Sequence, residues 1–420
     1  MTLKFSLHKT IIFCLIAITA NCVYAQKPYS DTIFNRSVAS INFGRNGFVL
    51  SEPIIGFNSG ESLRLNFDYL STESRYLNYT IVHCNADWSV SDLLKNEYLK
   101  SFTYDQINDV QYSNNSLQSY AHYELVFPND VITPTKSGNY ALIVYGDSEE
   151  DILFIRKFYI AEDLVSVNAK VKQATDIYDK FQKQEIDISI NKRGFSISNT
   201  SKLKLYIKQN GRTDNIISLP PSAVTADEIQ YFYDKENVFN GGSEFRTFDI
   251  KSVKYVLDRV ERIEDIENNY HVFLYPDKRR QFLAYETLPD INGQRYLKTE
   301  DYDNQLAAEY VWVHFFIPTN MPIYGGDLYV FGQLTDWKAI PEALMTYNPK
   351  LFGYQGALYL KQGYYNYQYV FMPKDKTTLD ETVTEGNHWE TENQYTIFVY
   401  YRPDGATYDR LIATKSIKSK

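Results

Sequence analysis

The 420-residue chain has few of the residues that permit covalent cross-links. It contains three cysteines, and two of them, Cys14 and Cys22, lie within the first 25 residues. Cys84 has no cysteine partner beyond that point, so an internal disulfide is excluded there and core burial must supply stability. We expect Cys84 to be a small buried hydrophobic residue rather than a reactive thiol.

Long apolar runs are also missing after residue 25, where no stretch approaches the ~18 consecutive apolar residues of a membrane-spanning helix. A shorter run at 11–18 follows two lysines and precedes compact residues ending at Ala25. This pattern predicts a signal peptide over residues 1–25, cleaved after Ala25. Lipidation at Cys22 is the alternative, but Asn21 is not the small residue expected before a lipidated cysteine. We expect no direct lipid insertion.

Basic residues are in the minority, with 43 Lys and Arg against 52 Asp and Glu. Removal of residues 1–25, which hold two lysines and no acid, leaves 41 against 52 and a net charge of −11. Nucleic acid needs clustered Lys and Arg to neutralise its phosphates. The charge therefore argues against nucleic acid and against an anionic lipid surface as partners.

The signatures of catalysis are absent. No G-x-S-x-G elbow occurs, since Gly241-Gly242-Ser243 lacks the closing glycine, and no phosphate-binding or dinucleotide-binding glycine motif is present. After residue 25 the histidines never fall at the i, i+4 spacing of a metal site; they are His83, His122, His271, His314 and His388. We therefore expect no enzymatic activity, no catalytic or cofactor-binding residues and no metal ligands.

The number of Asp and Glu residues does not exclude a glycosidase that works with a pair of carboxylates. However, the sequence lacks the alternation of strands and helices that forms the usual barrel scaffold of such enzymes. An oxygen-rich stretch at Asp290, Asn292 and 300–303 raises the possibility of calcium. Its spacing does not match a twelve-residue EF-hand loop, and we expect a solvated linker with Asx turns.

The chain is instead rich in tyrosine, with 37 of them, and in period-two alternation. Apolar residues alternate with polar ones over 63–67, 186–190 and 203–207, whereas Phe398 to Tyr401 is apolar on both faces. These short runs, bounded by Gly, Asn, Asp and Pro, predict an all-β protein of tandem Ig-like or E-set β-sandwich domains with very little helix.

Helical signals are confined to short turns within 87–99 and 301–309, while 254–266 fits either state and is expected to be a strand. A hairpin is predicted from 138–144 and 152–160. The predicted organisation is a signal peptide at 1–25, sandwich domains at 26–162 and 163–292, a linker at 293–305 and a third sandwich domain at 306–420.

The third domain resembles glycogen-binding-like Ig modules in its strings GDLYVFG (326–332), GYQGALYLKQGYYNYQYVF (353–371) and GNHWETENQYTIFVYYR (386–402). In that family exposed aromatic rings stack on sugars, and the candidates here are Trp337, Tyr365 and Trp389. A periplasmic or surface glycan-binding protein is thus the alternative function, although the same residues also serve as core and turn residues.

Longer strings resemble the type IX secretion system plug protein family over nearly the whole chain after residue 25. They are found at 78–102, 120–130, 135–144, 208–215, 241–249, 290–296 and 386–402. One departure is Ser243, where the family's string has Asn. The resemblance implies a non-enzymatic periplasmic plug, peripherally associated with the outer-membrane type IX translocon barrel, that seals its periplasmic opening when no cargo occupies the channel.

Overall fold

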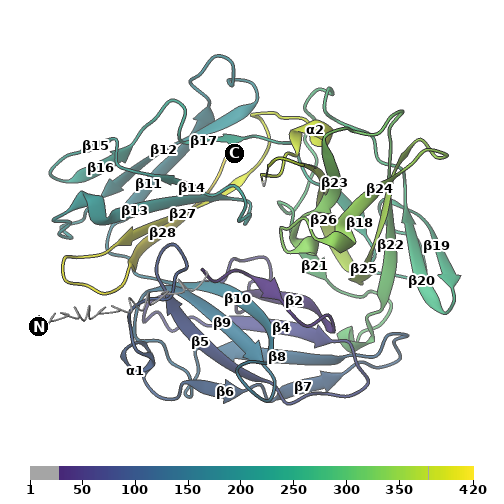
Figure 1. Ribbon diagram of the computed structural model, residues 1–420, viewed down its shortest axis with the longest axis horizontal. Coiled ribbons are helices and arrows are strands. Elements are labelled where there is room, and N and C mark those ends of the chain that lie inside the picture. Colours follow the sequence, from purple (N-terminus) through teal and green to yellow (C-terminus); the bar gives the residue numbers. More distant parts are fainter. Residues whose placement is uncertain (1–27, 377) are drawn as a thin grey trace, which may run out of the picture.

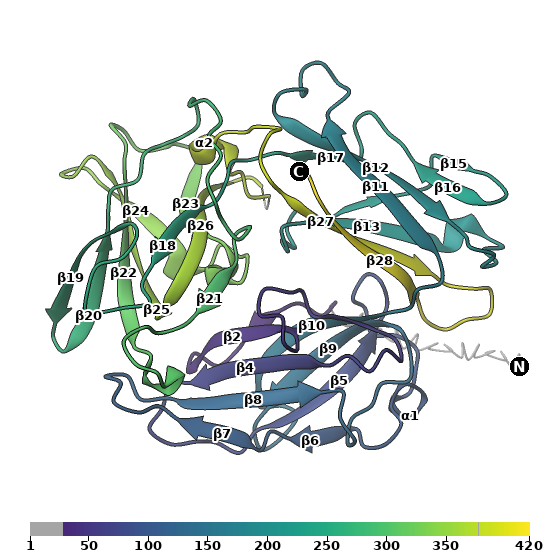
Figure 2. The ribbon, with the colours of Figure 1, turned by 180° about the vertical axis from the view of Figure 1, so that it is seen from behind.

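A computed structural model describes residues 28–376 and 378–420, so the expected signal peptide lies outside the described residues. The fold is all-β, as predicted. Three β units pack in a triangle, each beside the other two (Figure 1). Figure 2 shows the same triangle from behind, with the N-terminal unit along one side and the other two units above it. We call them the N-terminal sandwich, the middle sandwich and the third unit.

The N-terminal sandwich consists of two sheets packed around one core. One sheet has the order β1-β10-β9-β5-β6, with β3 also on β10, and the other has the order β2-β4-β8-β7. The elements are β1 (Thr32–Ile33), β2 (Val38–Arg45), β3 (Ile54–Gly56), β4 (Leu63–Tyr69), β5 (Asn78–Cys84), α1 (Lys95–Tyr98), β6 (Tyr104–Gln106), β7 (Asp109–Tyr112), β8 (Ala121–Phe127), β9 (Gly138–Tyr145) and β10 (Ile152–Ala161).

The middle sandwich also has two sheets, β11-β12-β16-β15 with β17 on β12, and β14-β13-β27-β28. Its elements are β11 (Ser166–Gln173), β12 (Lys183–Asn191), the 3-10 turn η1 (Thr200–Lys202), β13 (Leu203–Gln209), β14 (Ile217–Leu219), β15 (Ala223–Val224), β16 (Glu228–Tyr231), β17 (Val238–Asn240), β27 (Gln394–Tyr401) and β28 (Arg410–Lys418).

The third unit is a nine-stranded sheet of order β18-β26-β23-β24-β25-β22-β20-β19, with β21 on β26, whose strands share one core. Its elements are β18 (Arg246–Asp249), β19 (Val260–Ile266), β20 (Asn269–Leu274), β21 (Arg295–Leu297), η2 (Gln305–Ala307), β22 (Tyr310–Pro318), β23 (Gly326–Phe331), η3 (Gln333–Thr335), η4 (Pro341–Ala343), β24 (Leu344–Asn348), β25 (Gly353–Lys361), β26 (Gly363–Pro373) and α2 (Thr382–Glu385).

The alternating runs form strands because one side of each faces a core. In β4 the side chains of Leu63, Leu65 and Phe67 are fully buried, while Arg64 between them is exposed. The predicted hairpin is confirmed as β9 and β10, which pair antiparallel. The helical turns fall within the expected stretches, at α1 and η2, and the ambiguous stretch 254–266 ends in the strand β19.

Strand pairing departs from the expected domain boundaries in two places. The strands β27 and β28, expected in the third domain, pair with β13 and complete the middle sandwich. Conversely, β18 to β21, expected in the second domain and the linker, belong to the third unit, where β18 and β21 pair with β26 and β20 pairs with β22. The reason is physical, because alternation specifies which face of a strand is buried but not which strand lies beside it.

The strand β27 is apolar on both faces because it lies between two units. Val399 faces the core of the middle sandwich, whereas Phe398 and Tyr400 face the N-terminal sandwich. The ring of Phe398 stacks on Tyr159 with centroids 4.5 Å apart, and the hydroxyl of Tyr400 donates to Oδ1 of Asn139 at 2.7 Å. The unusual pattern at 398–401 is therefore the sequence of an internal interface.

Candidate functional site

The three aromatic residues proposed for glycan stacking do not form a common surface. Tyr365 is buried and its ring stacks on Phe248 at 5.1 Å, so it has no face for a sugar. Trp337 packs edge-on against Phe245 and Phe331, where the units meet. Trp389 lies elsewhere, with its backbone N–H donating to the carbonyl of Phe181. The sequence candidates are thus structural residues in separate places.

The oxygen-rich stretch, expected to be a solvated linker, lies within the third unit on either side of β21, and two of its carboxylates accept hydrogen bonds from nearby backbone and hydroxyl groups. The two carboxylate oxygens of Asp290 accept N–H bonds from Asn292 at 2.8 Å, an Asx turn, and from Phe245 at 2.6 Å. Asp301 accepts the hydroxyl of Ser252 and the N–H of Val253. Across residues 28–376 and 378–420, no group of three or more His, Cys, Asp or Glu is placed to hold a metal ion.

Cys84 is fully buried, as predicted, and burial raises the pKa of its thiol to about 12. The neighbouring His83 is buried too, where its ring nitrogens contact the hydroxyl of Ser91 at 2.8 Å and the carbonyl of Ser137 at 3.1 Å. Neither side chain opens into a cleft that would suit a nucleophile.

Buried ion pairs lock the three units together at their mutual junction. Lys361 of the third unit binds Asp68 of the N-terminal sandwich at 2.6 Å. Lys208 of the middle sandwich pairs with Glu52 of the N-terminal sandwich. Arg212 of the middle sandwich reaches Glu381 of the third unit at 3.2 Å. All six side chains are less than one-fifth exposed, so each contact between units includes a largely desolvated pair.

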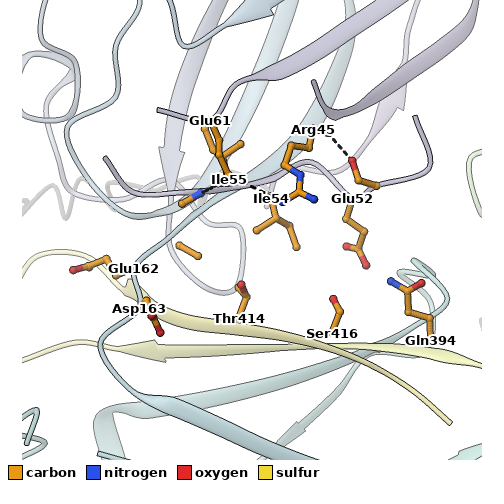
Figure 3. A pocket seen from close by; sticks show the side chains of 13 residues that line it. Arg45, Glu52, Ile54, Ile55, Glu61, Glu162, Asp163, Gln394, Thr414 and Ser416 are labelled. Atoms are coloured by element: carbon orange, nitrogen blue, oxygen red, sulfur yellow. Dashed lines mark hydrogen bonds and ion pairs between the residues drawn. The ribbon is translucent and has the colours of Figure 1, made fainter. Parts of the chain in front are cut away.

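Several cavities lie along these contacts. Two of them, of about 250 and 640 Å³, lie between the N-terminal sandwich and the third unit. Two more involve the middle sandwich. One of about 140 Å³ is lined by all three units, including Lys157, Asn210 and Trp337. The other, of about 470 Å³, lies between the N-terminal and middle sandwiches (Figure 3). Each of its four carboxylates already has a cation partner, so it offers no unpaired charge to a ligand; the pairs are Glu52–Lys208, Glu61–Arg45, Glu162–Arg410 and Asp163–Arg193.

Two loops, one between β11 and β12 and one after β20, lie at the end of the molecule marked by β17 and α2 (Figure 1). Apolar side chains on these loops are among the most exposed large apolar groups described, with Tyr178 at 87% and Phe282 at 89%. We define the apolar rim as Ile177, Tyr178, Phe181, Phe282 and Leu283.

The two rim loops are fixed by the segment that crosses from the third unit to the middle sandwich. The N–H of Trp389 donates to the Phe181 carbonyl at 3.2 Å, and the N–H of Arg280 donates to the Thr384 carbonyl at 2.8 Å. Arg280 also pairs with the buried Glu385 at 2.6 Å. The backbone at the base of each loop is thus held by hydrogen bonds. Less conformational entropy is therefore lost when a partner binds the apolar tips.

Sequence reasoning missed one histidine contact entirely. His271 on β20 and His314 on β22 are 43 residues apart, yet their Nδ1 and Nε2 atoms lie 2.8 Å from each other. Both strands alternate, so each histidine was predictable as an outward-facing residue, but the parallel pairing of β20 with β22 was not.

These features define a class of protein: an all-β body of three units joined by buried ion pairs, with exposed apolar side chains on two loops. No helix within residues 28–376 or 378–420 is long and apolar enough to cross a membrane. Residues 38–162 match the domain described as "Type 9 secretion system plug protein 1st domain". Among curated proteins, none matches the chain.

A crystal structure of a hypothetical protein from Parabacteroides merdae has the same architecture, with a TM-score of 0.90 and 33% sequence identity. The match covers 94% of this chain and all of that one. This chain belongs to the type IX secretion system plug protein family. It therefore has a plug role in type IX secretion, as the resemblance of its strings predicted.

Proposed function

We propose that the protein is a periplasmic plug that covers the periplasmic opening of the outer-membrane type IX translocon barrel while no cargo occupies the channel. The observation that carries the proposal is family membership, through the plug domain at 38–162. The proposal includes export by the expected signal peptide at 1–25 and a role without catalysis.

The rigidity of the body supports this role. A cover for an open channel must resist deformation, and three sandwiches joined by flexible linkers would bend. Here each pair of units shares a buried ion pair, and strands β27 and β28 return from the third unit to complete the middle sandwich. These pairs fix the relative placement of the units, because a unit that shifted would leave a charge buried without its partner.

The apolar rim supports a role in binding. Aromatic side chains are enriched at protein interfaces, and exposed apolar patches on monomeric proteins mark interaction sites. Charges of both signs flank the rim, with Asp176 and Asp179 on either side of Ile177 and Tyr178, and Lys278 and Arg279 before Phe282. We propose that the rim contacts the translocon through its apolar side chains.

Release then needs no chemical step. A ligand or cargo shifts a binding equilibrium only through its different affinity for two states. A channel that holds cargo needs only to bind the plug more weakly than an empty channel does.

Affinity purification of the translocon tests the proposal. We expect the protein to be recovered with translocon from cells whose cargo is depleted, and in lower yield from cells with abundant cargo. Deletion of its gene should raise outer-membrane permeability to large solutes. Absence of the protein from the purified translocon, together with unchanged permeability, would refute the proposed function.

A further inference from the structure

The end of the third unit that points away from the N-terminal sandwich carries exposed apolar side chains on two neighbouring turns. Strand β22 begins and β25 ends beside that sandwich, where Tyr310 and Lys361 bind Asp68, so the turns at the opposite ends of these strands lie far from it (Figure 1). One turn joins β22 to β23 and the other joins β24 to β25. We define the apolar tip as four side chains on these turns, each more than half exposed: Met321, Tyr324, Leu351 and Phe352.

Hydrogen bonds hold the two turns together at their base. The N–H of Thr319 donates to the carbonyl of Phe352 at 2.8 Å, and the N–H of Ile323 donates to the hydroxyl of Tyr354 at 2.8 Å. The backbone is thus ordered while the apolar side chains project from it. Little conformational entropy of the turns is lost when such a surface binds a partner.

Basic side chains surround the apolar tip. The loop at 374–376 adjoins it, since the N–H of Lys374 donates to the carbonyl of Gly325 at 3.0 Å. The loop at 275–284 adjoins it too, since the N–H of Asp277 donates to the carbonyl of Phe316 at 2.8 Å. The exposed cations on these loops and on the turns of the tip are Lys278, Arg279, Lys350, Lys374 and Lys376.

This end of the molecule is therefore basic, although the chain as a whole has more acid than base. The exposed acids on the same loops and at the start of β23 are Asp327 and Asp375, so the cations outnumber them by five to two. The buried Asp277 is not available to a partner, because it pairs with Arg246 and Arg259. The net charge of the chain, from which we expected no lipid partner, does not describe this end.

The residue types favour a lipid surface over a protein surface. Four of the five cations are lysines, and lysine is depleted at protein interfaces, where arginine is enriched. A lysine stem lies along apolar surface while its ammonium group stays among polar groups, which suits the boundary between lipid phosphates and acyl chains. Aromatic and aliphatic side chains beside lysines are the composition of elements that lie in this boundary.

We propose that the apolar tip docks peripherally on an anionic phospholipid surface, with its four side chains among the headgroups and the surrounding lysines at lipid phosphates. The location of that surface rests on the proposed function. The loop at 275–284 also carries Phe282 and Leu283 of the apolar rim, so a rim that contacts the translocon places the tip beside the leaflet around the barrel. The affinity for lipid does not rest on the proposed function.

Flotation of the tag-free chain 26–420 with phospholipid vesicles tests the proposal without any translocon. We expect binding to vesicles of phosphatidylcholine and phosphatidylglycerol in equal amounts, and at least about tenfold weaker binding to phosphatidylcholine alone. Lys350→Gln with Lys374→Gln should weaken binding to the anionic vesicles about 25-fold, because each basic residue near such a surface contributes about fivefold. The matched control is Lys100→Gln with Lys136→Gln on the N-terminal sandwich, which should leave the affinity unchanged.

The apolar side chains are tested separately. Met321→Ala with Tyr324→Ala should weaken vesicle binding at least about tenfold at an unchanged thermal midpoint, because two apolar groups no longer leave water. Phe102→Ala with Tyr104→Ala, which removes two exposed rings from the N-terminal sandwich, should leave vesicle binding unchanged. In Tyr324→Trp, tryptophan emission should shift to the blue on anionic vesicles and be quenched by brominated lipid.

No binding to the anionic vesicles, or equal losses in the tip and control variants, would overturn the proposal. So would tip variants that keep vesicle binding but no longer co-purify with detergent-solubilised translocon, because the tip would then be a protein contact. Vesicle binding that persists although purified translocon does not recover the chain would refute the proposed function and support the lipid contact.

Discussion

The Nζ atom of Lys361, at the end of β25, lies 2.6 Å from Oδ2 of Asp68 on β4. The same carboxylate accepts the hydroxyl of Tyr310 at 2.7 Å and faces Nδ1 of His122 at 2.6 Å. Burial opposes ionisation of Asp68, but Lys361 and His122 outweigh it and hold the pKa of the carboxyl below its ordinary value. Two strands that are almost 300 residues apart in sequence are thereby joined through one desolvated carboxylate.

Loss of that charge should loosen the contact between the N-terminal sandwich and the third unit. We expect Asp68→Asn to lower the free energy of unfolding by about 3–5 kcal/mol, because the ammonium of Lys361 stays buried without its counter-charge. Urea denaturation followed by tryptophan fluorescence measures the change. The matched control is Glu124→Gln, which breaks the Arg64–Glu124 pair on the same sheet. That pair is partly exposed and should cost no more than about 1 kcal/mol. Equal losses of unfolding free energy in the two variants would contradict the conclusion that the Asp68–Lys361 pair is the desolvated one.

His83 should make the protein less stable in mild acid. Burial lowers the pKa of this imidazole to about 4 from an ordinary 6.5. Below pH 6.5 the unfolded chain binds a proton that the folded chain refuses until about pH 4, so stability is full above 6.5 and falls between these values. The loss from this residue is about 3 kcal/mol across the window.

In His83→Gln the fall in stability between pH 7 and pH 4.5 should be markedly shallower, whatever the variant's stability at pH 8. Urea midpoints at the two pH values measure the slope. Asp68 does not interfere with this measurement. Its pKa in the folded protein lies below the ordinary 3.8, so its contribution to stability is lost only as the pH falls below that value. A slope equal to that of the parent chain would show that another group causes the acid sensitivity.

Cys84 should resist thiol reagents in the native state. With its pKa raised to about 12 from 9.0, the thiolate fraction near pH 8 falls about a thousandfold, and burial blocks access as well. We expect iodoacetamide to modify Cys84 quickly in urea and not detectably without it, as followed by mass spectrometry. Rapid modification of the native protein would mean that the end of β5, where Cys84 lies, opens readily to solvent.

The apolar rim should matter for partner binding and not for folding. We expect Phe282→Ala with Leu283→Ala to leave the thermal midpoint unchanged and to weaken co-purification with the translocon at least about tenfold, as loss of interface anchors does. The control is Phe102→Ala with Tyr104→Ala, which removes two rings of similar exposure from the N-terminal sandwich. Equal retention of both double variants would remove the rim from the proposed interface.

Much of the local structure was predictable from the sequence because alternation reports burial directly. The strands β4, β12 and β13 follow their apolar runs, and Cys84 is buried as expected for an unpaired cysteine. Pattern alone did not reveal that Tyr365, one of the suggested sugar-stacking rings, stacks internally on Phe248. The sequence does not indicate whether a tyrosine at an alternating position of a strand lies on the buried or the exposed face of the sheet.

The sequence by itself determined the all-β class, the short strands and, through its long strings, the plug family. Only the tertiary structure decided which strands are neighbours: β27 and β28 with β13, β20 with β22, and hence His271 with His314. It also decided that Asp68 and Lys361 meet. The alternation of buried and exposed residues can be read from neighbouring positions in the sequence. The pairing of strands instead depends on contacts between distant segments, and many sheet edges have similar patterns.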